Sequence, residues 1–172
     1  YPAFAAVLSA VTILFLLHPF KVRNKGYAGF EGAAARIIGD PALADSILFV
    51  SSDASGEGMF ISEVAMREKR MGHTIRRASK LLGQSNWSGS EYQSKLQDVD
   101  ALIELLEKEK IHVLTLDNSM RDAKRVEHHD LLEKAVASKP ERFNRLAQFD
   151  AKRIDRIHPG AVRVYALIPA AR

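Results

Sequence analysis

A short apolar run that leads into a polar turn constrains the fold of this chain more than any other stretch. Residues 47–50 read ILFV, a continuous apolar run of the kind found in strands covered on both faces, as in a parallel sheet. Residues 51–58 then supply small polar side chains and two glycines, and a helical pattern follows over 59–67. In open α/β sheets, ligands bind beyond the carboxyl ends of the strands. The turn is therefore the first place to expect a functional site.

Further strands and helices alternate along the rest of the chain. Apolar or alternating runs predict four more strands, over 73–79, 111–116, 143–149 and 162–168. Amphipathic patterns predict helices over 27–38, 98–110 and 127–138. This alternation is typical of a mainly parallel sheet with helices on both faces, and a short turn before the last strand allows it to pair antiparallel. We expect an α/β fold, three-layered and Rossmann-like, with a mainly parallel sheet of about five strands.

The N-terminal segment 1–20 contains no Asp, Glu, Lys or Arg. About 18 helical residues at 1.5 Å each cover roughly 27 Å, close to the ~30 Å thickness of the hydrocarbon core of a bilayer. We expect residues 1–20 to form a transmembrane helix, the last span of a longer protein, and residues 21–172 to form a C-terminal α/β domain. A buried core helix is the alternative, but a segment that is apolar all round would then need to be covered on all sides.

Composition excludes several classes of site. The net charge of +4 is mild, and basic residues are scattered among acidic ones, so no nucleic-acid partner is expected. The chain has no cysteine and no HExxH motif, so neither a metal site nor a disulfide framework is expected. Phosphate-binding and dinucleotide-binding glycine motifs are absent as well, and we expect no cofactor.

Three runs carry a resemblance to a known family: SSDASGEGMFISEVAMRE, HTIRRASKLLGQSNWSGSEYQ and IHVLTLDNS, all placed after an apolar helix. Together they resemble the C-terminal domain of bacterial membrane glycosyltransferases of the GT-C type. These are the dolichyl-phosphate-mannose-transferase-like enzymes, also described as glycosyltransferase family 39 or RgtA/B/C/D-like. The resemblance covers residues 20–167.

The resemblance implies a donor, a location and a limit on catalysis. It implies a polyprenyl-phosphate-linked sugar as donor and a domain at the cell membrane on the extracytoplasmic side. The positive-inside rule, applied to Lys21, Arg23 and Lys25, favours the cytoplasm instead. We give more weight to the orientation of the family, because many membrane spans determine it, whereas these three residues flank a single span. Family catalysis uses an acidic residue between early transmembrane helices, outside this chain. No catalytic residue is therefore predicted, and the chain by itself is expected to transfer no sugar.

The predicted ligand-binding residues lie in the turn, in a glycine-rich and serine-rich loop, and after a later strand. They are Asp53, Ser55, Gly56, Glu57, Trp87, Asp117 and Asn118. Backbone N–H groups at a helix start favour an anion, but the carboxylates of Asp53 and Glu57 repel one and suit carbohydrate hydroxyls better. Asp117 should lie at the same sheet edge as Asp53 if both strands are parallel. Trp87, with Tyr92, is of a type that stacks on a sugar ring.

Each of these residues also has a purely structural interpretation. Asp53 or Ser55 caps the following helix, while Gly56 supplies an unusual backbone angle. The polar residues from Asp117 onward form an ordinary turn, and Trp87 packs its loop onto the core. The adjacent His128 and His129 point to different sides of a helix, with His128 at the core margin, and Arg76, Arg77 and Lys80 form a solvated basic face.

Three functional hypotheses follow. The first is an accessory domain of a membrane glycosyltransferase that aids acceptor binding or packs on the membrane catalytic part. Its partners would be the membrane, the upstream transmembrane catalytic region, and a carbohydrate or lipid-linked sugar. The second is an independent membrane-anchored α/β enzyme or ligand-binding domain with its site at the edge that holds Asp53 and Asp117. The third is a structural module without a ligand.

Overall fold

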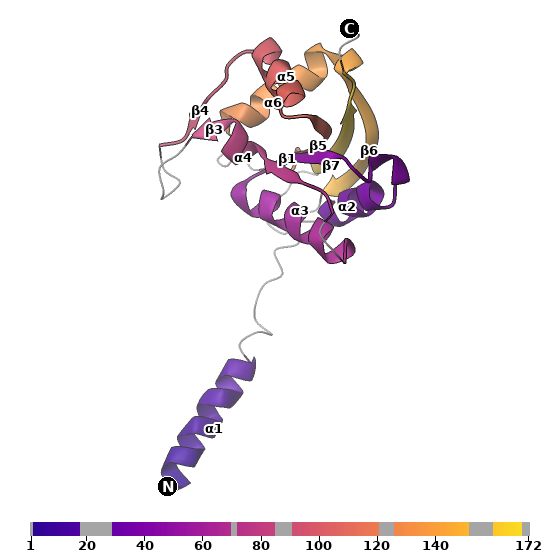
Figure 1. Cartoon of the computed structure of the whole chain (residues 1–172). Coiled ribbons are helices and arrows are strands. Elements are labelled where there is room, and N and C mark those ends of the chain that lie inside the picture. Colours follow the sequence, from indigo (N-terminus) through magenta and orange to yellow (C-terminus); the bar gives the residue numbers. More distant parts are fainter. Residues whose placement is uncertain are drawn as a thin grey trace.

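Five strands form one mixed sheet at the centre of the α/β body (Figure 1). The computed structural model describes residues 2–17, 29–69, 72–84, 91–120, 126–151 and 160–169. The sheet order is β2-β1-β5-β7-β6. Its strands are β1 (Ile47–Ser51), β2 (Ile75–Arg77), β5 (Ile111–Asp117), β6 (Phe143–Ala151) and β7 (Gly160–Leu167). The predicted α/β class is confirmed.

The direction of the last strand decides that the sheet is mixed. Strand β1 pairs in parallel with both β2 and β5. Strand β7 lies between β5 and β6 and runs antiparallel to both. The expected antiparallel pairing of the last strand is confirmed. The prediction of a mainly parallel sheet is wrong, because β7 lies between two strands and makes two of the four pairings antiparallel.

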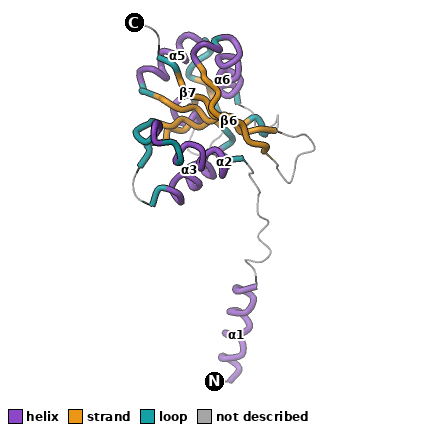
Figure 2. The backbone as a smooth tube through the Cα atoms, turned by 90° about the vertical axis from the view of Figure 1, so that its right-hand side faces the viewer, coloured by secondary structure: helices purple, strands orange, loops and turns teal. Residues whose placement is uncertain are grey.

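Helices cover both faces of the sheet (Figure 2). Helices α2 (Phe30–Ile38) and α3 (Ala54–Arg67) pack on one face, where Leu48 and Val50 of β1 point. Helices α4 (Ala78–Leu81), α5 (Val99–Lys108) and α6 (Glu127–Ser138) pack on the other, where Phe49 points. Successive strand residues point to opposite faces, so the continuous apolar run of β1 supplies two hydrophobic cores at once.

Two predicted elements have different bounds in the structure. The strand expected over 73–79 is limited to Ile75–Arg77, and α4 follows directly. The loop predicted over 83–92 begins with the short strand β3 (Gly83–Gln84), which pairs antiparallel with β4 (Gln93–Ser94) directly after the loop. Short 3-10 turns at Pro41–Leu43 and Pro140–Arg142 precede β1 and β6.

Helix α3 begins earlier than the sequence pattern indicated. The segment 51–58 was expected to be a turn, but the helix begins at Ala54. The carboxylate of Asp53 accepts a hydrogen bond from the backbone N–H of Gly56 at 2.8 Å, and its carbonyl accepts from Glu57 at 2.9 Å. The capping role proposed for Asp53 is thus confirmed, and a capped start allows small residues and two glycines to remain helical.

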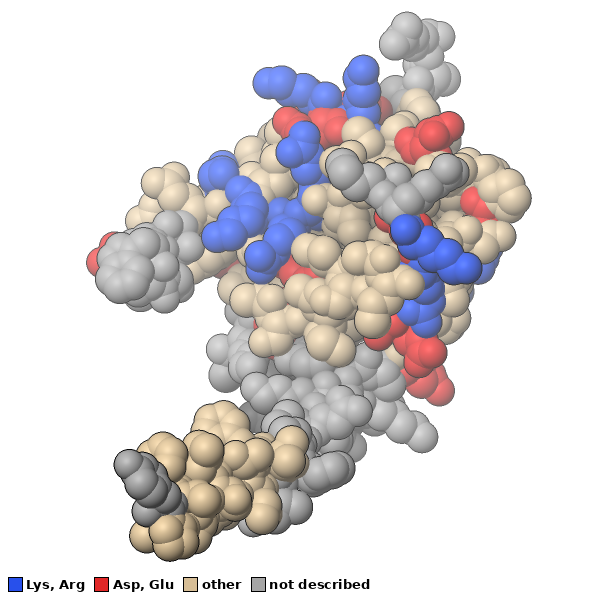
Figure 3. Space-filling model, turned by 60° about the horizontal axis from the view of Figure 1, so that its bottom comes forward, with Lys and Arg blue, Asp and Glu red and all other residues tan. Residues whose placement is uncertain are grey.

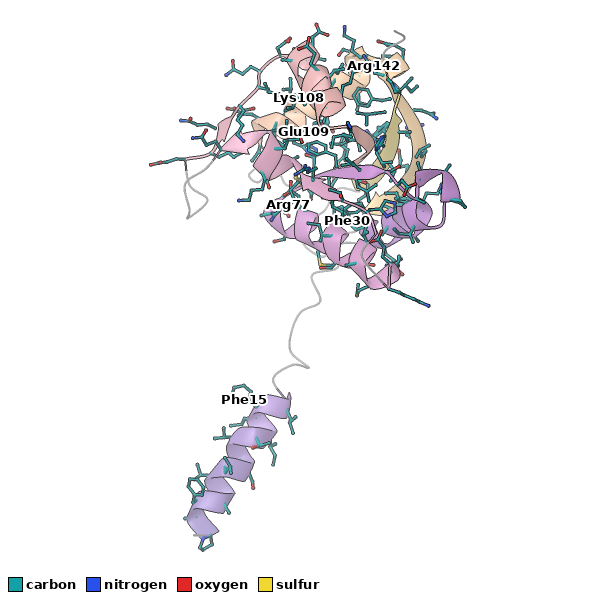
Figure 4. All side chains as sticks on the ribbon, in the orientation of Figure 1. Phe15, Phe30, Arg77, Lys108, Glu109 and Arg142 are labelled. Atoms are coloured by element: carbon teal, nitrogen blue, oxygen red, sulfur yellow. The ribbon has the colours of Figure 1, made fainter. Side chains whose placement is uncertain are left out.

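The N-terminal helix α1 (Pro2–Leu17) lies apart from the α/β body in Figure 1 and exposes its apolar side chains. Phe4 is 72% exposed and Phe15, which points outward in Figure 4, is 78% exposed. The alternative prediction, that this segment forms a buried core helix, is therefore wrong. In Figure 3, α1 shows no charged side chain, whereas the α/β body carries both signs of charge.

No helix in the described part of the chain combines the length and the apolar character needed to cross a bilayer. The transmembrane helix predicted over 1–20 is therefore not supported. The rest of that segment after Leu17, and the basic residues Lys21, Arg23 and Lys25, lie outside the described residues.

Candidate functional site

A pocket of about 430 Å³ lies at the carboxyl ends of β1 and β2. Its walls come from the residues after β1, the first turn of α3, the start of α4, the start of α6 and Tyr92. Asp53 and Ser55, both predicted to bind a ligand, line this pocket together with Lys80. The pocket therefore lies at the edge where open α/β sheets bind ligands, the edge to which the strand and turn pattern pointed.

Glu57 lies beneath the pocket and binds protein groups. Its carboxylate is fully buried and accepts hydrogen bonds from Arg77 Nε at 2.8 Å and from the backbone N–H of Ser79 at 2.9 Å. The Ser79 hydroxyl donates to the same carboxylate. Arg77, labelled in Figure 4, therefore does not belong to a freely solvated basic face, because it pairs with Glu57. This ion pair joins α3 to the end of β2.

Gly56 is needed because there is no room for a side chain at this position. Glycine with a positive φ occurs, among the described residues, only at Gly29, so the expected unusual backbone angle at Gly56 is wrong. A Cβ atom built on Gly56 would lie 2.0 Å from Ser52 Oγ and 3.3 Å from Phe30 Cε2. The absence of a side chain at Gly56 lets α3 approach the segment that leaves β1.

Asp117 lies at the same sheet edge as Asp53, as expected for the ends of parallel strands, but it does not line the pocket. Its carboxylate is fully buried and accepts from Ser52 Oγ at 2.6 Å, from Ser119 N at 2.8 Å and from Ser119 Oγ at 2.5 Å. The side-chain amide of Asn118 donates to Glu133 on α6. These bonds tie the segments that follow β1 and β5 to each other and to the middle of α6, in agreement with the turn interpretation.

Two further residues, His128 and Tyr92, line the pocket. Tyr92 had been predicted only as a possible stacking partner beside Trp87, and His128 had no predicted role in the site. His128 is 1% exposed, and its Nδ1 shares a hydrogen bond with the Tyr92 hydroxyl. The two ring centroids are 5.5 Å apart. Burial lowers the pKa of His128 to about 4, against the opposing effect of the Asp130 carboxylate. Burial, helped by the charge of Glu127, raises the pKa of Tyr92, so both groups are neutral near neutral pH.

Neighbouring His129 has a separate role. It is fully buried, and its Nδ1 lies 2.9 Å from Ser51 Oγ at the end of β1. The two adjacent histidines thus contact different partners, as their helical positions predicted. Within the described ranges, no three His, Asp or Glu side chains come together as possible ligands of one metal ion. Trp87 lies outside the described residues.

The lowered pKa of His128 makes stability depend on pH in a predictable direction. The unfolded chain binds a proton near the ordinary histidine pKa of 6.5, whereas the folded chain binds it only near 4. Stability from this group is complete above about pH 6.5 and decreases as the pH falls toward 4, because the unfolded state then binds more protons. We expect the free energy of unfolding to fall by about 2 kcal/mol between about pH 7 and pH 5.

Urea unfolding of the wild type and of His128→Gln at a series of pH values measures this effect. The glutamine variant does not titrate at this position, so the difference between the two pH curves isolates His128. Parallel curves between neutral and mildly acidic pH would contradict the assignment of a neutral buried imidazole.

A second cavity of about 370 Å³ lies at the opposite edge of the sheet, where β5 begins and β7 ends. Apolar side chains such as Ile111, Phe143 and Leu167 line it, and two of its charged residues, Glu107 and Arg142, form an ion pair with each other. Lys110 also lines this cavity. Arg142 and Arg77 are labelled well apart on the body in Figure 4. Because most of its lining is apolar and two of its three charged residues pair with each other, this cavity is the weaker candidate for a polar ligand.

The fold and the pocket define an α/β domain with a polar site at the carboxyl edge of the parallel part of its sheet. Comparison of the chain with models of protein families, with curated proteins and with solved structures finds no match.

Proposed function

We propose that this chain is the C-terminal, extracytoplasmic accessory domain of a membrane glycosyltransferase that uses a polyprenyl-phosphate-linked sugar. In this proposal α1 and its flanking residues belong to the last membrane span of a longer protein, and the α/β body packs on the membrane catalytic part and helps to bind the acceptor. The three sequence runs that resemble the GT-C family support the proposal.

The observation that carries the proposal is the uncovered apolar surface of α1. A helix that is apolar on every side is stable only when lipid or protein covers it, and contiguous exposed apolar surface marks an interaction site. Leu8, Leu14 and Phe15 are all more than half exposed, at 56%, 67% and 78%. A membrane and the preceding spans of the same protein would supply that cover.

The bonding of the two aspartates supports an accessory role over a catalytic one. Asp53 accepts from the backbone of its own helix, and Asp117 accepts from the backbone and hydroxyl of Ser119. Carboxylates committed to holding local structure are poorly placed to exchange protons with a substrate. A second candidate, an independent membrane-anchored ligand-binding domain, is favoured by the pocket that contains Asp53 and Ser55.

A cysteine accessibility assay tests the location of the domain. The chain contains no cysteine, so Glu104→Cys, on the exposed side of α5, adds one reactive thiol to it. The variant is made in the complete gene product and expressed in bacterial cells, with the unsubstituted protein as control. We expect a membrane-impermeant maleimide to label the thiol in intact cells. Labelling only after the cells are opened would contradict an extracytoplasmic domain.

A transfer assay tests the accessory role. The purified chain is incubated with a polyprenyl-phosphate sugar and with candidate acceptors, and product is sought by mass spectrometry. We expect no transfer, because the catalytic region of the resembled family lies in earlier membrane spans. Sugar transfer by the chain alone would contradict the proposal and favour an independent enzyme.

A further inference from the structure

His128, which lines the pocket, carries a buried polar atom that lacks a partner within the described residues. His128 is 1% exposed and lines the pocket, and its Nδ1 is occupied by the Tyr92 hydroxyl. No described group forms a hydrogen bond with its Nε2. Buried polar atoms are nearly always hydrogen-bonded, and an unsatisfied one costs about 1–3 kcal/mol. A ligand in the pocket would supply the missing bond.

The charges around the pocket favour a neutral ligand. The guanidinium of Arg77 is neutralised by the buried carboxylate of Glu57. The two other charged residues in the described lining, Asp53 and Lys80, carry opposite signs. An anion at the start of α3 would be attracted by the helix dipole but repelled by the Asp53 carboxylate that caps the same helix. The described residues around the pocket thus offer hydrogen-bond donors and acceptors, and their charges sum to zero.

We propose that this pocket binds a neutral sugar, with a sugar hydroxyl bonded to His128 Nε2 and the face of the sugar ring near Tyr92. A hydroxyl both donates and accepts, so it satisfies Nε2 in either tautomer of the neutral imidazole. Tyr92 adds an aromatic face to the same wall, and aromatic rings pack well against the apolar C–H face of a sugar. A volume of about 430 Å³ is at the scale of small-molecule sites.

The inference deepens the proposed function, because it names a sugar as the ligand of the accessory domain. The role of the sugar as acceptor rests on that function, whereas the binding itself rests on the pocket alone. Binding and membrane location are therefore measured separately, and either can fail without the other.

Ligand-detected NMR on the full chain tests the binding. The chain is held in micelles of a detergent without a sugar headgroup, and saturation transfer is measured to a panel of methyl glycosides of common hexoses and pentoses. Two substitutions separate the ring nitrogens. In His128→Asn the amide takes the place of Nδ1 and keeps a partner for Tyr92, whereas in His128→Gln it takes the place of Nε2. Ser55→Trp fills the mouth of the pocket from an exposed position, without altering buried groups.

We expect at least one glycoside to bind saturably to the wild type and to His128→Gln. Binding to His128→Asn should be about tenfold weaker, which corresponds to about 1.4 kcal/mol. Binding to Ser55→Trp should be lost even if His128→Asn does not fold. Any one of three results would overturn the inference. These are no saturable binding of any glycoside, unchanged binding to both His128→Asn and Ser55→Trp, and displacement of the sugar by inorganic phosphate at lower concentration. If these occur while the accessibility assay labels intact cells, only the sugar site fails.

Discussion

Replacing Gly56 by alanine is expected to lower the free energy of unfolding by about 4 kcal/mol. The new methyl group would lie 2.0 Å from Ser52 Oγ and 2.8 Å from Ser52 Cβ, so the helix or the segment after β1 must move. Overpacking of a dense interior costs about 1–3 kcal/mol. Moving Ser52 also breaks its 2.6 Å bond to the buried carboxylate of Asp117, a loss of about 1.5–3 kcal/mol for a charged partner.

Gly58, two residues further along α3, is the matched control. A Cβ atom there would meet no heavy atom within 4 Å, and both glycines lie within the same helix. Gly58→Ala should therefore stabilise the protein by about 0.5–1 kcal/mol through the better helix propensity of alanine. Urea unfolding of both variants measures the contrast. Similar stabilities for the two variants would show that α3 does not approach Ser52 as closely as we describe.

Replacing Arg77 by methionine is expected to cost about 3–4 kcal/mol of unfolding free energy. The change leaves the fully buried carboxylate of Glu57 without its cation, although the Ser79 donors remain. Breaking a buried ion pair by removing one partner typically costs about 3–5 kcal/mol, because the remaining charge has lost its solvation. Methionine preserves much of the aliphatic packing, so the loss reports mainly on the charge.

Arg76, the preceding residue, provides the control for Arg77. Its side chain is 51% exposed, against 32% for Arg77, and it lies 3.7 Å from Glu109 at the surface. Arg76→Met should change the unfolding free energy by at most about 0.5 kcal/mol. Adding Glu57→Gln to Arg77→Met should recover part of the loss, because an amide needs no counter-ion. If the double variant is less stable than Arg77→Met alone, the uncompensated charge is not the cause.

Features that depend on local periodicity were predictable from the sequence. Helix α5 is the clearest case, since Asp98 accepts a hydrogen bond from Ala101 N at 3.0 Å as its cap. The four apolar positions predicted to face inward, Val99, Leu102, Ile103 and Leu106, are all buried. A helix places residues i, i+3, i+4 and i+7 on one face wherever it packs, so no distant contact is needed for this inference.

Features that depend on distant partners were not predictable. The pattern of β7 is compatible with any strand position, and pairing with β5 and β6 decided its place in the sheet. The sequence around Gly56 indicated an unusual backbone angle. In the structure glycine is needed there because a side chain would collide with Ser52. Tyr92 and His128 are 36 residues apart, and neither has a neighbour in sequence that indicates their hydrogen bond.

The sequence by itself determined the strand that begins the site, a cap at either Asp53 or Ser55, the edge shared by Asp53 and Asp117, and the identity of most helices. Only the tertiary structure decided that Glu57 pairs with Arg77, that Asp117 bonds Ser52 instead of lining the pocket, and that His128 faces that pocket. The physical reason is the range of the interactions. Periodicity and capping act over a few residues, whereas the burial of a charge or an imidazole depends on side chains that only the folded chain brings together.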